Sequence, residues 1–196
     1  MHRRLSTKIA KSGDCLRNHF LLAMPQLSGG IFSQSITYIC EHDEGGAMGI
    51  VINRPLDLSV NDMFKDLGIS TQSDSHRLQV MAGGPVQVDH GFVLHRHCGR
   101  SWEASIKVTP EIRLTSSRDI LRAIAADDGP SNHLIALGYA GWAADQLEQE
   151  LAENSWLTLP GDSEIIFSTT YDKRLSAAKT LLGIDMNLIS SQAGHA

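Results

Sequence analysis

The fold is decided by the stretch Ser35–Pro55, which has the sequence SITYICEHDEGGAMGIVINRP. Its first half, residues 36–41, alternates apolar and more polar side chains, as a half-buried strand does. Residues 43–46 supply a turn, and β-branched side chains in residues 48–52 favour a second strand. The stretch therefore predicts a β-hairpin, and we expect the remaining elements to assemble around it.

Short apolar runs along the rest of the chain predict further strands. They lie at residues 20–24, 78–81, 91–95, 106–108, 112–114, 134–137, 156–159 and 165–167. The run at 134–137 is expected to stop at Gly138, because glycine weakens a strand interior. Pro55 is expected to end the hairpin ladder, since proline has no amide to donate.

Four helices are predicted from apolar periodicity and capping residues. They cover residues 59–68, a segment that begins at a Ser116 cap and stops at Asp128-Gly129-Pro130, residues 143–154 and residues 172–182. Ser59 with Asp62 is typical of a capped helix start, and Gly68 and Gly183 are typical of helix ends.

The irregular order of these elements does not match a repeating α/β pattern. We predict an α+β fold with a mixed, partly coiled or barrel-like β-sheet surrounded by about four helices. Residues 1–13 are basic and lack periodicity, which predicts a mobile N-terminal arm, and residues 14–196 are expected to form a single domain. The first part of the tail 184–196 is expected to dock on that domain.

Composition indicates a soluble cytoplasmic protein. The chain has 196 residues and a net charge of -5, which disfavours nucleic-acid binding over the surface as a whole. Cys15, Cys40 and Cys98 form no Cys-x-x-Cys pair, so we expect free thiols and a reducing compartment. No signal peptide is predicted, and the apolar runs are shorter than the roughly 20 residues that span a membrane.

Motifs spread along the chain carry a family resemblance. They are NHFLLAMP at 18–25, YICEH at 38–42, GAMGIVINRP at 46–55, GGPV at 83–86, GFVLH at 91–95, GYAGW at 138–142, QLE at 146–148, NSWL at 154–157 and GHA at 194–196. With them the chain resembles the bacterial AlgH/YqgE family of uncharacterised proteins. The resemblance implies a small barrel-like sheet wrapped by helices, a cytosolic protein and, by family label, a transcriptional regulator. It supplies no catalytic residue. The chain departs from the family in having Gly29-Gly30 where Asp-Pro is common, and in its first dozen residues.

Three ionisable residues of the hairpin, Glu41, His42 and Arg54, are candidates for catalysis. Pairing about the turn would place Arg54 far from His42, so the alternative interpretation is structural: Glu41 and His42 bond turn amides, and Asn53 and Arg54 brace a neighbouring loop. His95, His97 and Cys98 are residue types that bind zinc, but no clear fourth ligand accompanies them, and we predict no metal site or cofactor.

Other motifs argue against common functional classes. Gly83-Gly84-Pro85 and residues 138–142 are explained by tight turns, because the chain has no phosphate-binding glycine motif. There is no Gly-x-Ser-x-Gly elbow of a serine hydrolase. The predicted helix 143–154 carries four acidic residues and no Lys or Arg, which disfavours entry into a DNA groove.

The leading hypothesis is a non-catalytic binding or regulatory protein with an unidentified protein or small-molecule partner. Its candidate binding surface gathers residues at predicted strand and helix ends: Asn53, Arg54, Gly84, Gly141, Trp142 and Gln146. The alternative is a small-molecule enzyme that uses Glu41, His42 or Arg54. A third possibility, DNA binding through the basic arm, depends on residues 1–13.

Overall fold

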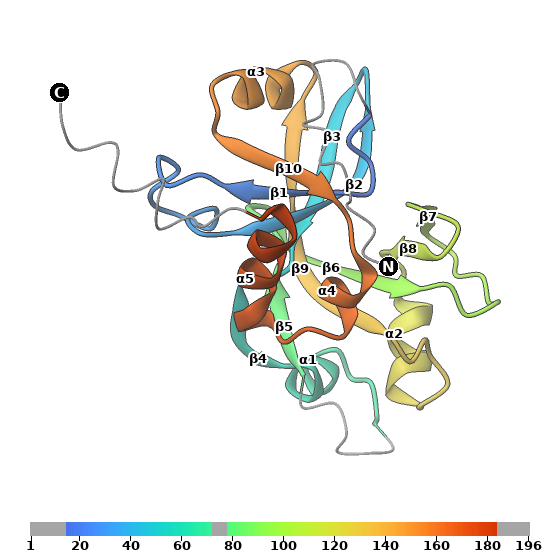
Figure 1. Ribbon diagram of the computed structural model, residues 1–196. Coiled ribbons are helices and arrows are strands. Elements are labelled where there is room, and N and C mark those ends of the chain that lie inside the picture. Colours follow the sequence, from blue (N-terminus) through green and yellow to red (C-terminus); the bar gives the residue numbers. More distant parts are fainter. Residues whose placement is uncertain (1–14, 72–77, 184–196) are drawn as a thin grey trace, which may run out of the picture.

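The computed structural model describes residues 15–71 and 78–183. A curled β-sheet runs through the molecule, with helices at its ends and on its faces (Figure 1). The predicted arm 1–13 and the docking of the tail 184–196 lie outside the described residues. Within them, no helix is long and apolar enough to cross a membrane.

The predicted hairpin is present as β2 (Ile36–Asp43) and β3 (Gly46–Val51). The strands are antiparallel, with Thr37 opposite Val51 near one end. The register shifts between Ile39 and Glu41, which is a β-bulge at Cys40. Residues 36–40 are all buried, so both faces of this part of the hairpin are covered.

The strand that joins most of the sheet is β9 (His133–Ala143). It pairs with β3 and β6 (Val86–Arg96) in antiparallel fashion and with β5 (Gln79–Ala82) in parallel. The prediction that this strand stops at Gly138 was wrong. Gly138 has a φ of 72° and packs so closely on Gly84 that an added Cβ would lie 2.5 Å from the Gly84 carbonyl oxygen, so glycine lets the strand continue past a crowded point.

The full strand order is β10-β1-β2-β3-β9-β6-β8-β7, with β4 paired to β5 off this path. The remaining strands are β1 (His19–Ala23), β4 (Pro55–Ser59), β7 (Ser105–Lys107), β8 (Ile112–Thr115) and β10 (Trp156–Pro160). Pro55 does not end all pairing, because it begins β4 and lies opposite Met81 of β5. One parallel pair in an otherwise antiparallel, curled sheet confirms the predicted mixed α+β class.

The described residues contain five helices where about four were expected. They are α1 (Val60–Asp66), α2 (Arg118–Ala125), α3 (Gln146–Ala152), α4 (Ser163–Phe167) and α5 (Tyr171–Leu182). The Ser59 hydroxyl accepts the Asp62 amide at 3.1 Å, which confirms the predicted cap of α1. Gly183 closes α5 in the left-handed conformation, as predicted.

Three element boundaries or types were predicted wrongly. Ser117, not Ser116, occupies the N-cap position of α2. Helix α3 begins later than predicted because Ala143 still pairs with Gly46 in the sheet. Residues 165–167 belong to α4 and not to a strand, because the Asp162 carboxylate accepts the amides of Glu164 and Ile165 and starts a helical turn.

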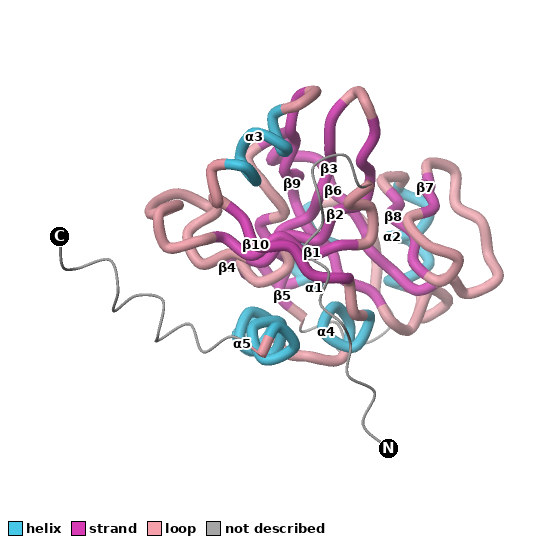
Figure 2. Tube along the Cα trace, turned by 45° about the horizontal axis from the view of Figure 1, so that its top comes forward, coloured by secondary structure: helices cyan, strands magenta, loops and turns pink. Residues whose placement is uncertain are grey.

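The buried side chains form three clusters, which explain where the helices lie. Alternate residues of β6 and β9 face opposite sides: Val93 and Ile135 pack with α1 and α2, whereas Leu94 and Leu134 pack with α4 and α5. The third cluster lies under α3. Figure 2 shows α4 and α5 side by side below the strands, and Figure 1 shows α3 at the far end from α1 and α2.

Candidate functional site

Gly141, Trp142 and Gln146 are brought together at the junction of β9 and α3. The Trp142 indole donates to Glu150 at 2.8 Å, and the Gln146 amide donates to the other Glu150 oxygen at 2.9 Å. Trp156 also donates to Glu150, at 2.7 Å. The carboxylate thus accepts three hydrogen bonds, and it joins α3 to β9 and β10.

An aromatic cluster surrounds this network. Trp142 and Trp156 meet edge to face with ring centroids 5.9 Å apart, and Phe32 packs on Trp156 at 5.5 Å. Trp142 and Trp156 are 6% and 4% exposed. Because both indoles are buried and bonded, this part of the predicted binding surface holds the fold together.

Asn53 and Arg54 lie at the opposite end of β3 from that network. Gly141 is opposite Met48 on β3, and Asn53 follows five residues later, a span of roughly 17 Å in an extended chain. Asn53 accepts the Ile36 amide at 2.9 Å and donates to the Gln34 carbonyl at 3.0 Å, so it braces the loop before β2 as the structural interpretation expected. The structure therefore does not bring Asn53 and Arg54 together with Trp142.

Arg54 differs from Asn53 because no hydrogen bond from its side chain to the loop before β2 is found among the described residues. Its Nε atom is buried and has no hydrogen-bond partner among the described residues. Its backbone carbonyl accepts the Ala82 amide at 2.7 Å and links the segment between β3 and β4 to the end of β5.

Gly84 lies apart from both the β9–α3 junction and the Asn53–Arg54 segment, and it packs on the backbone of β9. An added Cβ at Gly84 would lie 2.0 Å from the Tyr139 carbonyl carbon, so the position requires glycine for close approach of two strands. Its role in the described structure is backbone packing.

His42 is held by two hydrogen bonds. The structural interpretation had expected it to bond the turn amides, but its partners are Leu16 and Glu148. Its Nδ1 atom accepts the Leu16 amide at 2.8 Å, which requires that Nε2 carries the proton donated to Glu148 at 2.7 Å. Asp43 instead accepts the turn amide of Gly45. With both ring nitrogens engaged and Arg54 at the other end of the hairpin, the described geometry does not assemble the three catalytic candidates.

Glu41 lines an open hollow of about 590 Å³ beside the hairpin turn. Asp43, Tyr139 and Gly141 line it as well. The hollow lies over the strands where β3, β6 and β9 meet, and His42 is not among its lining residues.

The histidine and cysteine candidates have separate surroundings. His95 is fully buried, with Nε2 2.9 Å from the Thr115 hydroxyl and Nδ1 2.9 Å from the Arg96 carbonyl. Within residues 15–71 and 78–183, no three His, Cys, Asp or Glu side chains group in a way that could hold a metal. Cys40 is buried, and desolvation raises the pKa of its thiol, whereas Cys15 and Cys98 are exposed.

A second candidate site is a cavity of about 500 Å³ between β5, β9 and the turn from α4 to α5. Its apolar wall is formed by Val60, Leu78, Met81, Leu134, Ile135 and Phe167. Its polar lining residues are Gln79, His133, Ser168, Thr169, Thr170, Tyr171 and Arg174. The volume is in the range of small-molecule sites, which are mostly apolar with a few convergent polar groups.

Arg174 is the most unusual side chain in this cavity, because it is a cation that is only 9% exposed. Its Nε donates to the Thr169 carbonyl at 3.0 Å, and Nη1 donates to the Ile52 carbonyl at the end of the hairpin. Desolvation lowers the pKa of Arg174 to about 10, so the guanidinium stays charged at neutral pH.

The sequence interpretation did not single out Arg174 or the cavity. One signal was present: in the predicted helix 172–182, Arg174 lies four residues before the inward-facing Ala178 and so falls on the apolar face. A charged residue on the buried stripe of a helix is a candidate for function. The partners on β5 and β9 are far away in sequence, so no local pattern could have supplied them.

The comparisons with known proteins agree with the fold. A family model described as AlgH-like matches residues 20–187. A UPF0301 protein of Saccharophagus degradans is 52% identical over 92% of this chain and 89% of its own length. A UPF0301 protein of Thioalkalivibrio sulfidiphilus is 51% identical over 91% of this chain and 96% of its own length.

Solved structures give the same result. The solution structure of the AlgH protein from Pseudomonas aeruginosa is 44% identical, with a TM-score of 0.76 over 95% of this chain and 99% of that one. The crystal structure of protein DIP2367 from Corynebacterium diphtheriae shares the fold at 17% identity, with a TM-score of 0.68 over 86% of this chain and 88% of that one. These matches confirm the resemblance seen in the sequence motifs, and the chain belongs to the AlgH-like family.

Proposed function

We propose that this protein is a non-catalytic, cytoplasmic binding protein whose ligand is a small molecule held in the cavity between β5, β9 and the α4–α5 turn. The observation that carries the proposal is the cavity itself, about 500 Å³ with an apolar wall and one buried cation. Three free cysteines support a reducing compartment.

In this proposal, any regulatory role passes through the ligand or a partner protein and not through direct contact with DNA. Helix α3 has no Lys or Arg, and the net charge of -5 repels a polyanion. The enzyme alternative is not favoured by any specific contact, because His42 bonds Leu16 and Glu148 and the described cavity lining includes none of the three catalytic candidates.

The test uses a neutral probe, so that binding reports on the apolar cavity and not on attraction to the charge of Arg174. We expect N-phenyl-1-naphthylamine to bind with one-to-one stoichiometry, measured by its fluorescence, and to be displaced by whatever small molecule native mass spectrometry finds on the purified protein. Ser168→Phe places a ring at the cavity wall and should abolish binding, whereas the matched variant Ser101→Phe changes an exposed residue outside the lining.

Equal probe binding by Ser168→Phe and the unmodified protein would contradict the assignment of the cavity. Circular dichroism and thermal unfolding of both variants control for folding, since Ser168 also ends α4.

A further inference from the structure

The buried guanidinium of Arg174 has no acidic counterpart in the part of the chain that the structure describes. Among the described residues, no carboxylate oxygen lies within ion-pair distance of it, and none of the described residues that line the cavity is Asp or Glu. A buried cation without a counter-charge is costly, and natural proteins rarely keep one without a reason.

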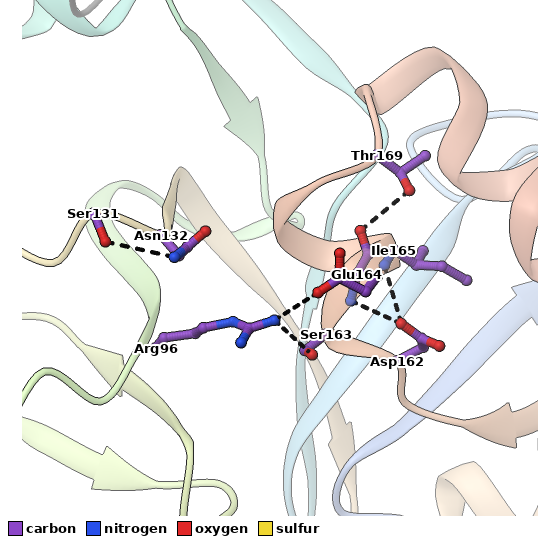
Figure 3. Close-up of polar contacts among 8 residues, drawn as sticks. All are labelled: Arg96, Ser131, Asn132, Asp162, Ser163, Glu164, Ile165 and Thr169. Carbon is purple, nitrogen blue, oxygen red and sulfur yellow. Dashed lines mark hydrogen bonds and ion pairs between the residues drawn. The ribbon is translucent and has the colours of Figure 1, made fainter.

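The carboxylates nearest in sequence to the cavity are all engaged elsewhere. Asp162 accepts the first amides of α4, and Glu164 pairs with Arg96 at 2.8 Å and points away from α5 (Figure 3). Asp172, in the first turn of α5, is exposed, and a hydrogen bond from the Thr170 side chain holds its pKa below the ordinary value. Within the described ranges, these contacts leave the charge of Arg174 without a counter-charge.

The guanidinium also keeps unused donors. It has five N–H groups, of which the two hydrogen bonds to Thr169 and Ile52 use two. Nη2 has no hydrogen bond to any residue in the described ranges, and Arg174 forms part of the cavity wall. The remaining N–H groups are therefore available to an acceptor inside the cavity.

The start of helix α5 does not supply a second binding group for an anion. It is 12 residues long and begins at the cavity with Thr170, whose side chain makes no capping bond to the first amides. The Asp172 carboxylate already places an anion in this first turn, because it accepts the backbone amides of Asp172 and Lys173. The evidence for an anionic ligand is therefore the buried, partly unbonded guanidinium of Arg174.

We propose that the ligand carries an anionic head group, a carboxylate or a phosphate, on an apolar body, and that Arg174 binds the head group; this rests on the proposed function of the cavity. The head group takes the N–H groups that the protein leaves unused. The apolar body lies against the wall that includes Met81, Leu134 and Phe167.

The experiment compares three probes of one chain length: octanoate, octyl phosphate and the neutral octanol. Calorimetry on the full chain should show that at least one anionic probe binds more tightly than octanol. Arg174→Gln should weaken that probe about ten- to a hundred-fold and change octanol binding little, because only charge-assisted hydrogen bonds are lost. The matched variant Arg122→Gln, exposed on α2 and outside the cavity lining, should change neither.

Preference for octanoate assigns a carboxylate head group, and preference for octyl phosphate assigns a phosphate. Octanol binding as tight as the anions, unaffected by Arg174→Gln, would overturn this inference and leave the cavity as a ligand site. Failure of all three probes together with N-phenyl-1-naphthylamine would overturn the proposed function as well.

A measurement on the unmodified protein covers the case in which Arg174→Gln does not fold. The Arg174 Nε–H signal in a nitrogen-proton correlation spectrum should shift on addition of the preferred anion and stay in place with octanol. An unmoved signal at saturating anion would overturn the role of Arg174.

Discussion

Around Glu150, the indole and amide donors meet one carboxylate, whereas beside Arg174 a buried cation keeps unused donors at a cavity wall. Both regions contain buried polar groups between helix and sheet. The first is rich in sequence motifs, including GYAGW and NSWL, and the second has almost none. The comparison teaches that a conspicuous motif can serve packing, and that unsatisfied chemistry is the better guide to a binding site.

The largest effect should come from breaking the satisfied region. Trp142→Ala removes a buried ring from the aromatic cluster and should lower the free energy of unfolding by about 3–5 kcal/mol, measured by urea denaturation. Trp142→Phe keeps most of the ring and loses the bond to Glu150, so its loss should be smaller.

Neither Trp142 variant should change probe affinity in the Arg174 cavity while the protein remains folded. If Trp142→Phe left stability intact but abolished ligand binding, Trp142 would belong to a functional site and the comparison would fail.

A second prediction concerns His95, another buried group with both polar atoms bonded. Desolvation lowers the pKa of His95 below its ordinary value of 6.5. The unfolded chain therefore binds a proton at His95 more readily than the folded protein does. The free energy of unfolding should fall as the pH drops from 6.5 toward the pKa of His95 in the folded protein, by at most about 1.4 kcal/mol per pH unit.

Unfolding free energies measured from pH 7.5 to pH 5 should show this loss, and His95→Gln should flatten it. An unchanged pH slope in His95→Gln would show that other groups carry the acid sensitivity.

The smallest effect on stability should come from Arg174→Met. The change leaves two carbonyls without a donor but also removes the cost of a buried charge, so unfolding free energy should change by about 1 kcal/mol or less. Urea denaturation of Arg174→Met and Trp142→Ala compares the two changes in unfolding free energy. A loss as large as that of Trp142→Ala would mean that Arg174 is retained for the fold.

Much of the fold followed from local patterns. The hairpin, the Ser59 cap and the Gly183 helix end depend on neighbouring residues, and the structure confirms all three. The wrong predictions concern segments whose conformation depends on residues outside the local pattern. Gly138 does not end β9, because β3 and β6 pair with the residues that follow it, 139–143. Residues 165–167 are apolar in either conformation, and the Asp162 cap makes them a helix.

The candidate site was predictable to a smaller degree. Asn53 was expected to brace a loop, and it does so. Arg54 and Trp142 were predicted to share one surface, but Trp142 lies beside the start of β3 and Arg54 follows its end. Register, which sets that separation, depends on which strand lies beside β3, and no local motif encodes it.

By itself, the sequence determined the α+β class, the hairpin and membership of the AlgH-like family, because periodicity, caps and motifs are local properties of the chain. Only the tertiary structure decided that Ile52, Leu134 and Arg174 meet beside one cavity. These residues come from segments separated by up to 122 positions, and the energy of a buried charge depends on what surrounds it in space.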